Sequence, residues 1–252
     1  MVDMRSLTEV AKANDIPVIE DAAQAHGASW EGLGPGQWSD AACFSFYVSK
    51  NLGALGEGGA VFSRDRALTD RITRMANHGA TSKYVHEDVG VNSRLDGVQA
   101  AVLRVKLQHL PEWNRRRREL AARYDRLLDR IASVEPPHIA PGAEHVFHLY
   151  VLQVPDRDAI LRYLQAAGVQ AGVHYPIPLH EQNAYRAFRS AQDGLPVTTA
   201  AASRVLSLPI YPEMTDQQVE AVCETLEAAV AAASRPPGRL VGGAAVRAKQ
   251  VC

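Results

Sequence analysis

A short apolar run that ends beside a lysine constrains the fold of this chain more than any other feature. Residues 42–47 are apolar and aromatic, and the glycine-rich stretch 53–59 follows them closely. This pattern is typical of a buried strand that ends in a tight loop. Lys50 stands where the strand ends. Apolar surroundings disfavour the charged form of an amine, so a lysine placed there can attack a carbonyl and form a Schiff base. The alternative is a lysine that simply reaches into solvent, which is the commoner situation.

A second apolar run, residues 17–20, directly precedes Asp21. In parallel α/β sheets, binding sites form at the carboxyl ends of the strands. The gap between Asp21 and Lys50 is long enough for a connection and a return strand, which would bring both residues to one edge of a sheet. A carboxylate there can hold a cationic ring nitrogen, as pyridoxal phosphate enzymes require. Without Lys50, Asp21 would be interpreted as a helix N-cap or a turn residue.

Short strands and amphipathic helices follow one another along the rest of the chain. Apolar spacing and breaking residues predict helices over 1–14, 65–76, 95–110, 112–133, 157–167 and 215–233, and strands over 16–20, 42–47, 60–63, 146–154 and 169–174. Pro111 is expected at a helix start. After residue 76 we predict a polar loop, the kind of segment in which substrate contacts concentrate.

Charge and cysteine content argue against several classes of protein. The formal net charge of −1 gives no general attraction to nucleic acid or to an anionic membrane. The arginine run 115–118 is interspersed with acidic residues, which favours a solvated helical face over a nucleic-acid stripe. Three cysteines favour a reducing cytoplasm without a disulfide framework. No apolar stretch reaches the roughly 18 residues that a membrane helix needs.

A series of short motifs runs along the chain in the order of one known family. The motifs occupy residues 21–27, 44–54, 58–60, 77–79, 83–84, 92–96, 99–101, 174–176 and 208–215. With them the chain resembles the DegT/StrS family of pyridoxal phosphate-dependent sugar-nucleotide aminotransferases, over nearly its whole length up to Ala233. An ordered set of this kind is far more specific than any single motif.

The resemblance implies an α/β fold of the aspartate-aminotransferase type, called fold type I, with a smaller α+β domain after it. Residues 1–135 would form the remainder of the cofactor-binding large domain and the linking helix, 136–234 the small domain, and 235–252 a disordered tail. Chains of the family begin well upstream, with a loop for the cofactor phosphate, whereas this sequence opens on a helix directly before a strand. We therefore expect an N-terminally truncated large domain.

The resemblance also implies a set of cofactor contacts. Lys50 would bind the aldehyde of pyridoxal 5′-phosphate, Asp21 would keep the pyridine nitrogen protonated, and Gln24 would lie near the phenolic oxygen. Ser45 would bond the phosphate, and Asn92 would reach the phosphate of the neighbouring subunit, which implies a homodimer with a shared active site. Relatives that act as sugar dehydratases have histidine where this chain has Lys50.

Substrate contacts are implied in two further regions. The residues concerned are His78, Lys83, Tyr84, His174, Tyr175, His180 and Tyr211. An isolated polar loop is more often only solvated, so the first three depend on the resemblance. His174 and His180 also suggest metal ligands, but no third ligand accompanies them in the sequence, so we predict no metal site.

The function implied by the resemblance is transamination of a keto-sugar nucleotide, with glutamate as amino donor, in the making of amino sugars for antibiotics or surface glycans. Two alternatives stay open. One is an inactive or regulatory truncated homologue that binds a sugar nucleotide. The other is a different lysine-dependent Schiff-base enzyme, such as an aldolase, although that chemistry has no need of Asp21 and Gln24. We expect a cytoplasmic protein whose partners are small molecules and a second copy of itself, not nucleic acid or membrane.

Overall fold

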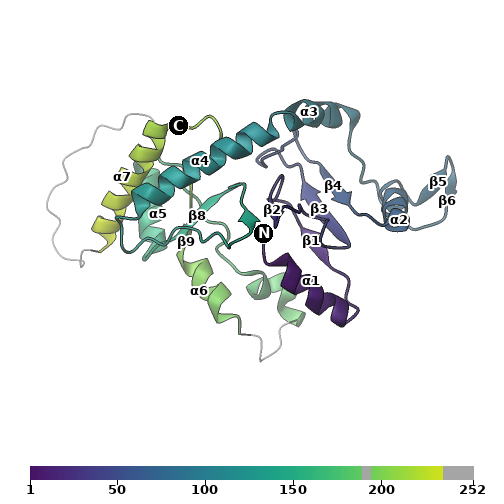
Figure 1. The fold of residues 1–252 in the computed structure, drawn as a ribbon, viewed down its shortest axis with the longest axis horizontal. Coiled ribbons are helices and arrows are strands. Elements are labelled where there is room, and N and C mark those ends of the chain that lie inside the picture. Colours follow the sequence, from purple (N-terminus) through teal and green to yellow (C-terminus); the bar gives the residue numbers. More distant parts are fainter. Residues whose placement is uncertain (189–193, 235–252) are drawn as a thin grey trace. The chain divides into compact units, whose positions relative to one another are not determined.

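The structure, a computed structural model, describes residues 1–188 and 194–234 (Figure 1). The chain packs into two units. Unit 1 comprises Met1–Arg118 and Ile139–His148, and unit 2 comprises Glu119–His138 and the described residues that follow His148. The division into domains over 1–135 and 136–234 stays a prediction. The tail predicted for 235–252 lies outside the described residues.

The central sheet of unit 1 has three strands, β1 (Ile19–Asp21), β3 (Ala41–Ser45) and β4 (Gly59–Phe62). Their order is β1-β3-β4, and Figure 1 shows them side by side. β1 and β3 run parallel, whereas β3 and β4 run antiparallel. The strands fall where the apolar runs predict them, with ends shifted by a few residues. A parallel pair joined by a long connection is the arrangement expected to bring strand ends together.

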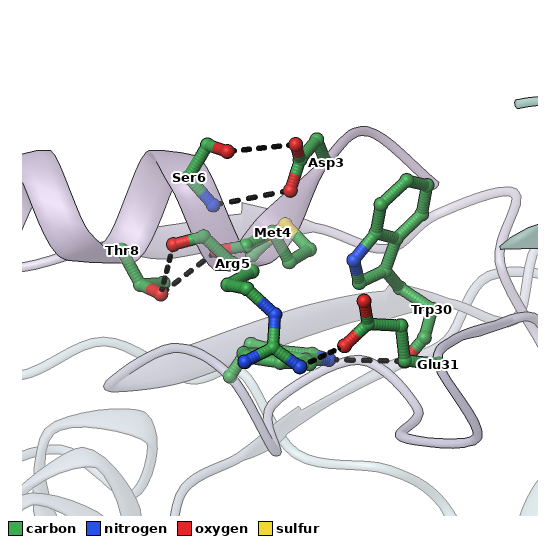
Figure 2. Close-up of polar contacts among 8 residues, drawn as sticks. Asp3, Met4, Arg5, Ser6, Thr8, Trp30 and Glu31 are labelled. Carbon is green, nitrogen blue, oxygen red and sulfur yellow. Dashed lines mark hydrogen bonds and ion pairs between the residues drawn. The ribbon is translucent and has the colours of Figure 1, made fainter. Parts of the chain in front are cut away.

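Helix α1 (Met4–Ala13) packs on unit 1 through Met4, Thr8 and Ala11, which are buried at helical spacing. Asp3 caps its first turn by accepting hydrogen bonds from the backbone nitrogen and the hydroxyl of Ser6 (Figure 2). Arg5 forms an ion pair with Glu31, also drawn in Figure 2, and its guanidinium lies 5.5 Å from the ring centre of Trp38. Through Arg5 the helix is therefore tied to the connection between β1 and β3.

Helix α2 (Arg66–Ala76) begins after Asp65, whose carboxylate accepts hydrogen bonds from two backbone nitrogens of the first turn. The predicted loop after it is wrong in part, because it contains a hairpin of β5 (Ala80–Ser82) and β6 (Val85–His86). At the tip of the hairpin Tyr84 adopts a positive φ of 71°, which allows a tight turn. Tyrosine rarely adopts this conformation, so the sequence does not predict the turn. Figure 1 shows the hairpin extending beyond α2.

Helix α3 (Gly97–Leu107) leads to the long helix α4 (Leu110–Leu128), with Pro111 near its start as predicted. The first part of α4 belongs to unit 1, and the helix continues into unit 2. A small antiparallel pair, β2 (Ser29–Trp30) with β7 (Ala143–Glu144), brings the returning chain back onto unit 1. The sequence did not predict this pair, because two-residue strands carry no periodicity.

Unit 2 is built on β8 (Tyr150–Gln153) and β9 (Val205–Leu208), which pair antiparallel. Its helices are α5 (Arg157–Ala166), α6 (Pro196–Arg204) and α7 (Asp216–Ala233), with the 3₁₀ turns η1 (Leu179–Glu181) and η2 (Asn183–Phe188). The strand predicted over 146–154 is wrong in its first half, and the strand predicted over 169–174 is reduced to one bridge between Gly172 and Ser207. Neither β9 nor α6 was predicted.

The core of unit 2 centres on two stacked tyrosines. Tyr124 and Tyr150 have ring centres 4.7 Å apart. The Tyr124 hydroxyl donates to the carbonyl of Pro209 at 2.8 Å, and the Tyr150 hydroxyl donates to Asp125 at 2.6 Å. Burial raises the pKa of both hydroxyls, so they stay protonated donors. Within the described ranges, no helix is long and apolar enough to cross a membrane.

Candidate active site

Two of the predicted site residues end adjacent parallel strands. Asp21 is the last residue of β1 and stands opposite Cys43 of β3, and Ser45 ends β3 two positions later. The exposed Asp21 carboxylate accepts a hydrogen bond from the backbone nitrogen of Ala23 at 3.1 Å, and the Ser45 hydroxyl oxygen accepts one from Tyr47 at 3.2 Å. Both side chains therefore lie at the carboxyl edge of the sheet, where α/β folds form their sites.

Lys50 lies in a tight turn directly after β3. Its backbone nitrogen donates to the carbonyl of Tyr47 at 2.9 Å, and Ala54 closes the wider loop by donating to Phe46 at 2.8 Å. Gly53 is required here, because a β-carbon on it would lie 2.4 Å from the carbonyl oxygen of Val48. The Lys50 residue is half-buried. The turn thus holds an amine beside the strand end that carries Ser45.

Asp21 and Gln24 line a common cavity of about 360 Å³ in unit 1. The rest of its wall is mostly apolar and includes Met4 and Leu7 of α1 and Ile19 of β1. Lys50 and Ser45 are not among the residues that line it. Of the five predicted cofactor residues, Asp21 and Gln24 therefore share the cavity, Ser45 and Lys50 lie at the end of β3 and in the turn after it, and Asn92 lies apart from both groups.

His26 packs against the segment that leads to the Lys50 turn, and it is only 4% exposed. Its ring is wedged against Phe44 and Phe46, with ring centres 5.5 Å and 5.9 Å away. Within the described part of the chain, neither ring nitrogen makes a hydrogen bond. Burial lowers the pKa of His26, the nearby Ser45 backbone partly offsets this, and the charge of Lys50 lowers it further. The imidazole is therefore neutral at physiological pH.

The loop residues predicted to meet substrate are all on the surface of unit 1. His78, Lys83 and Tyr84 are exposed, and the Lys83 ammonium lies 5.1 Å from the ring centre of Tyr84. Asn92 is bridged to Asn77, and its side-chain oxygen accepts a hydrogen bond from Arg94 at 2.9 Å. Their contacts with substrate or with a second subunit stay predictions.

The other predicted substrate residues belong to unit 2. His174 contacts the hydroxyl of Ser207 at 2.8 Å, and the ring of Tyr175 stands edge-on to it. His180 lies 3.6 Å from the carboxylate of Glu181, and Tyr211 is half-buried. Their roles also stay predictions. No group of three or more His, Cys, Asp or Glu side chains in residues 1–188 and 194–234 is placed to hold a metal ion.

The arginine run on α4 is not the uniformly solvated face predicted for it. Arg117 is 7% exposed and donates to the carbonyl of Phe147 at 3.0 Å, and Arg118 pairs with Glu144 at 3.0 Å. Residues 143–148 return to this side of the helix and cover it. A local sequence pattern cannot predict burial by a segment so far along the chain. The arginines are thus partly structural.

Sequence reasoning did not assign any role to Asn51 or Asn114, although both are buried and hydrogen-bonded to each other beside Lys50. Asn51 follows the lysine directly, which was the available signal. Asn114 stands alone in a charged helix, a setting that usually indicates solvent exposure.

The DegT/DnrJ/EryC1/StrS aminotransferase family matches residues 1–227, so the chain belongs to this family. It is 45% identical over 226 residues to the erythromycin biosynthesis sensory transduction protein EryC1 of Saccharopolyspora erythraea, a match that covers 90% of this chain and 62% of the relative. It is 42% identical over 224 residues to the dTDP-3-amino-3,4,6-trideoxy-alpha-D-glucose transaminase of Streptomyces venezuelae, covering 89% and 59%.

Among solved structures, S. venezuelae DesV in complex with a ketimine intermediate superimposes with a TM-score of 0.87 at 41% identity, covering 94% of this chain and 63% of DesV. The predicted α/β fold of this family is therefore confirmed. The chain spans about three fifths of the length of these relatives.

Proposed function

We propose that this chain carries the cofactor-binding part of a pyridoxal phosphate-dependent aminotransferase that acts on a keto-sugar nucleotide. The observation that carries the proposal is the placement of Asp21 and Ser45 at the ends of two adjacent parallel strands, with Lys50 in the turn that follows. Family membership supports it, because the family is named for its aminotransferases.

The side chains at this edge fit the cofactor of the family, which is pyridoxal 5′-phosphate. An amine matches its aldehyde, a carboxylate matches its ring nitrogen, and a hydroxyl beside a turn matches its phosphate. Bound there, the cofactor supplies an electron sink that makes a proton on the substrate carbon acidic. Lys50, Asp21 and Ser45 are the residues that would hold these three groups, and Gln24 would lie near the phenolic oxygen.

The work of the chain itself is positioning and proton transfer. Lys50 Nζ would hold the cofactor, and as a free amine it would act as the general base that takes a proton from the substrate carbon. The Asp21 carboxylate would favour the protonated ring nitrogen by offering it a negative partner. The Asn92 side chain, on the exposed surface of unit 1, is available to a second copy, and we propose a homodimer with shared sites.

We propose glutamate as amino donor and a nucleotide-linked keto sugar as acceptor. The name of the S. venezuelae relative, a dTDP-amino-sugar transaminase, supports the acceptor class. Substrate contacts are proposed for His78, Lys83, Tyr84, His174, Tyr175, His180 and Tyr211. We place the reaction in the cytoplasm, in amino-sugar biosynthesis for an antibiotic or a surface glycan.

The test is transfer of an isotopically labelled amino nitrogen from glutamate to a dTDP- or UDP-linked keto sugar, followed by mass spectrometry of the sugar. The matched control is Lys50→Arg, which keeps the positive charge but cannot hold the cofactor or act as the base. We expect labelled amino sugar with the native chain and none with the variant. A folded native chain that binds cofactor and transfers no nitrogen to either class of sugar would overturn the proposed acceptor.

A further inference from the structure

We propose that Asn114 of α4 is a positioning residue, which fixes the Lys50 turn relative to the loop that follows Asp21. The inference rests on the proposed function for its catalytic meaning, but its structural content does not need bound cofactor. Asn114 is 3% exposed and belongs to unit 1, as do both segments that it joins.

The first contact is with the residue next to Lys50. Asn51 is 5% exposed, and its side-chain nitrogen donates to Asn114 Oδ1 and to the carbonyl of Val146, each at 3.0 Å. The Val146 carbonyl can only accept, so the Asn51 amide nitrogen must face it. The remaining oxygen, Asn51 Oδ1, lies 3.2 Å from His148 Nδ1, which must therefore be the donor. Every polar atom of the Asn51 side chain is thus oriented by a partner.

The second contact is with the loop after Asp21. Asn114 Nδ2 donates to the carbonyl of His26 at 2.8 Å, so a single amide bonds the Lys50 turn with its oxygen and the Asp21 loop with its nitrogen. The approach depends on Gly27, which has a φ of 85°. A β-carbon there would lie 2.7 Å from Asn114 Nδ2. The loop is therefore shaped to admit this amide.

The His26 ring adds a link that does not use hydrogen bonds. While its carbonyl is held by Asn114, its ring packs on Phe44 and Phe46 of the segment that leads to Lys50. Displacement of the loop would therefore also disturb the end of β3. The loop therefore contacts both α4 and the end of β3, and α4 also contacts the Lys50 turn that follows β3.

Packing alone does not require this polar pair. An apolar cluster of Leu52, Ala54, Leu103 and Leu110, with Phe46 against it, already holds the residues after Lys50. Apolar contacts are non-directional, whereas a buried amide must find partners in fixed directions or leave polar atoms unsatisfied. The Asn51–Asn114 pair therefore specifies where the turn lies. The Lys50 amine and the Asp21 carboxylate must lie at a fixed separation to engage one small ring, and Asn114 sets that separation.

The direct test is hydrogen exchange of the full chain without added cofactor. The Asp21 loop is followed through the amides of Ala25 and Ala28, and the Lys50 turn through those of Lys50 and Ala54, all of which are hydrogen-bonded within their own segments. In Asn114→Ala we expect about tenfold faster exchange in both segments, with the amides of α1 unchanged. Unchanged exchange in both segments, or an equal increase throughout unit 1, would overturn the proposal.

Two further variants keep the test decisive if Asn114→Ala does not fold. Asn114→Asp keeps the acceptor toward Asn51 but loses the donor toward His26, so only the Asp21 loop should exchange faster. Gly27→Ala places a β-carbon against Asn114 Nδ2 from the loop side. Like Asn114→Asp, it should therefore speed exchange in the Asp21 loop and not in the Lys50 turn. The control is Thr8→Ala, which removes a different buried polar group of unit 1, a hydroxyl hydrogen-bonded within α1. It should leave both segments unchanged.

Cofactor is then added, and its attachment to Lys50 is trapped with borohydride and quantified by peptide mapping. We expect about tenfold slower attachment in Asn114→Asp and native attachment in Thr8→Ala. Native attachment in an Asn114→Asp variant whose loop exchanges faster would refute the positioning role. If the native chain takes up no cofactor, the proposed function fails, while the exchange data still decide whether Asn114 joins the two segments.

Discussion

Asp21, the last residue of β1, pairs with Cys43 of the parallel strand β3. Cys43 stands two residues before Ser45, with which β3 ends. This relationship explains why one carboxylate and one hydroxyl, far apart in sequence, share an edge of the sheet. Lys50 follows five residues after that serine, in a turn closed by the hydrogen bond from its backbone nitrogen to the carbonyl of Tyr47. The three groups that we propose for the cofactor therefore lie at, or shortly after, the carboxyl ends of two adjacent strands.

Asp21→Asn should separate the charge of this residue from its structural role. The amide oxygen can still accept the hydrogen bond from Ala23, and the side chain is exposed, so stability should change little. Transamination should fall by roughly a hundredfold, because a charge-assisted bond contributes up to about 3 kcal/mol. Urea unfolding and amino transfer measure the two effects. Native activity in the variant would show that Asp21 does not face the ring nitrogen.

Gly53→Ala should displace the Lys50 turn. The added β-carbon would lie 2.4 Å from a backbone oxygen, and the backbone must shift to relieve the overlap. We expect a loss of about 1–3 kcal/mol in unfolding free energy. Gly97→Ala is the matched control, because no atom lies within 4 Å of its added β-carbon, and it should be neutral or slightly stabilising. Equal stability of the two variants would contradict the turn geometry.

Stability should fall in acid because of His145. Burial lowers its pKa to about 4, helped by the positive amino terminus, and its neutral Nδ1 accepts a hydrogen bond from the Phe147 backbone at 2.9 Å. In the unfolded chain its pKa is near the usual 6.5. The unfolded state therefore binds more protons between these values. The stabilisation is present above pH 6.5 and is lost as the pH falls toward 4.

His145→Asn tests this pH dependence, because the amide oxygen replaces the Nδ1 acceptor and does not titrate. Urea midpoints measured at pH values from 7 to 4 should decline less in the variant than in the native chain. A decline of the same size in both would assign the acid sensitivity to other groups.

Tyr124→Phe should destabilise unit 2 by about 1 kcal/mol, because it removes the hydrogen bond to the Pro209 carbonyl while leaving the ring stacked on Tyr150. Tyr163→Phe, on an exposed side chain, is the control and should be neutral. Thermal and urea unfolding give both values. A neutral Tyr124→Phe would mean that water replaces the hydroxyl at no cost.

Local sequence signals predicted the elements that carry the candidate site. The apolar runs before Asp21 and Lys50 mark β1 and β3, and capping residues such as Asp65 and Thr215 mark helix starts. Each of these signals depends on residues that are close together in the sequence. The ends of the strands were shifted because a strand stops where its pairing with a neighbouring strand stops, and that neighbour is distant in the sequence.

What escaped prediction depends on distant partners. The hairpin turn at Tyr84 needs a positive φ there. Glycine or asparagine at that position would have indicated such a turn, but tyrosine does not. The burial of Arg117 depends on a segment some thirty residues further along the chain. Asn114 meets His26 and Asn51 only after folding, because they lie 88 and 63 residues away in sequence. A sequence pattern predicts the chemistry of Lys50, but only the fold shows which distant residues hold its turn in place.

The most direct test of the proposed site is to mix the purified chain with pyridoxal 5′-phosphate, reduce with borohydride and locate the added mass by peptide mapping. We predict label on Lys50, an absorption band from the bound cofactor, and no label in Lys50→Arg. A well-folded chain that carries no label on Lys50, or carries it equally on other lysines such as Lys12 and Lys106, would contradict the proposed site.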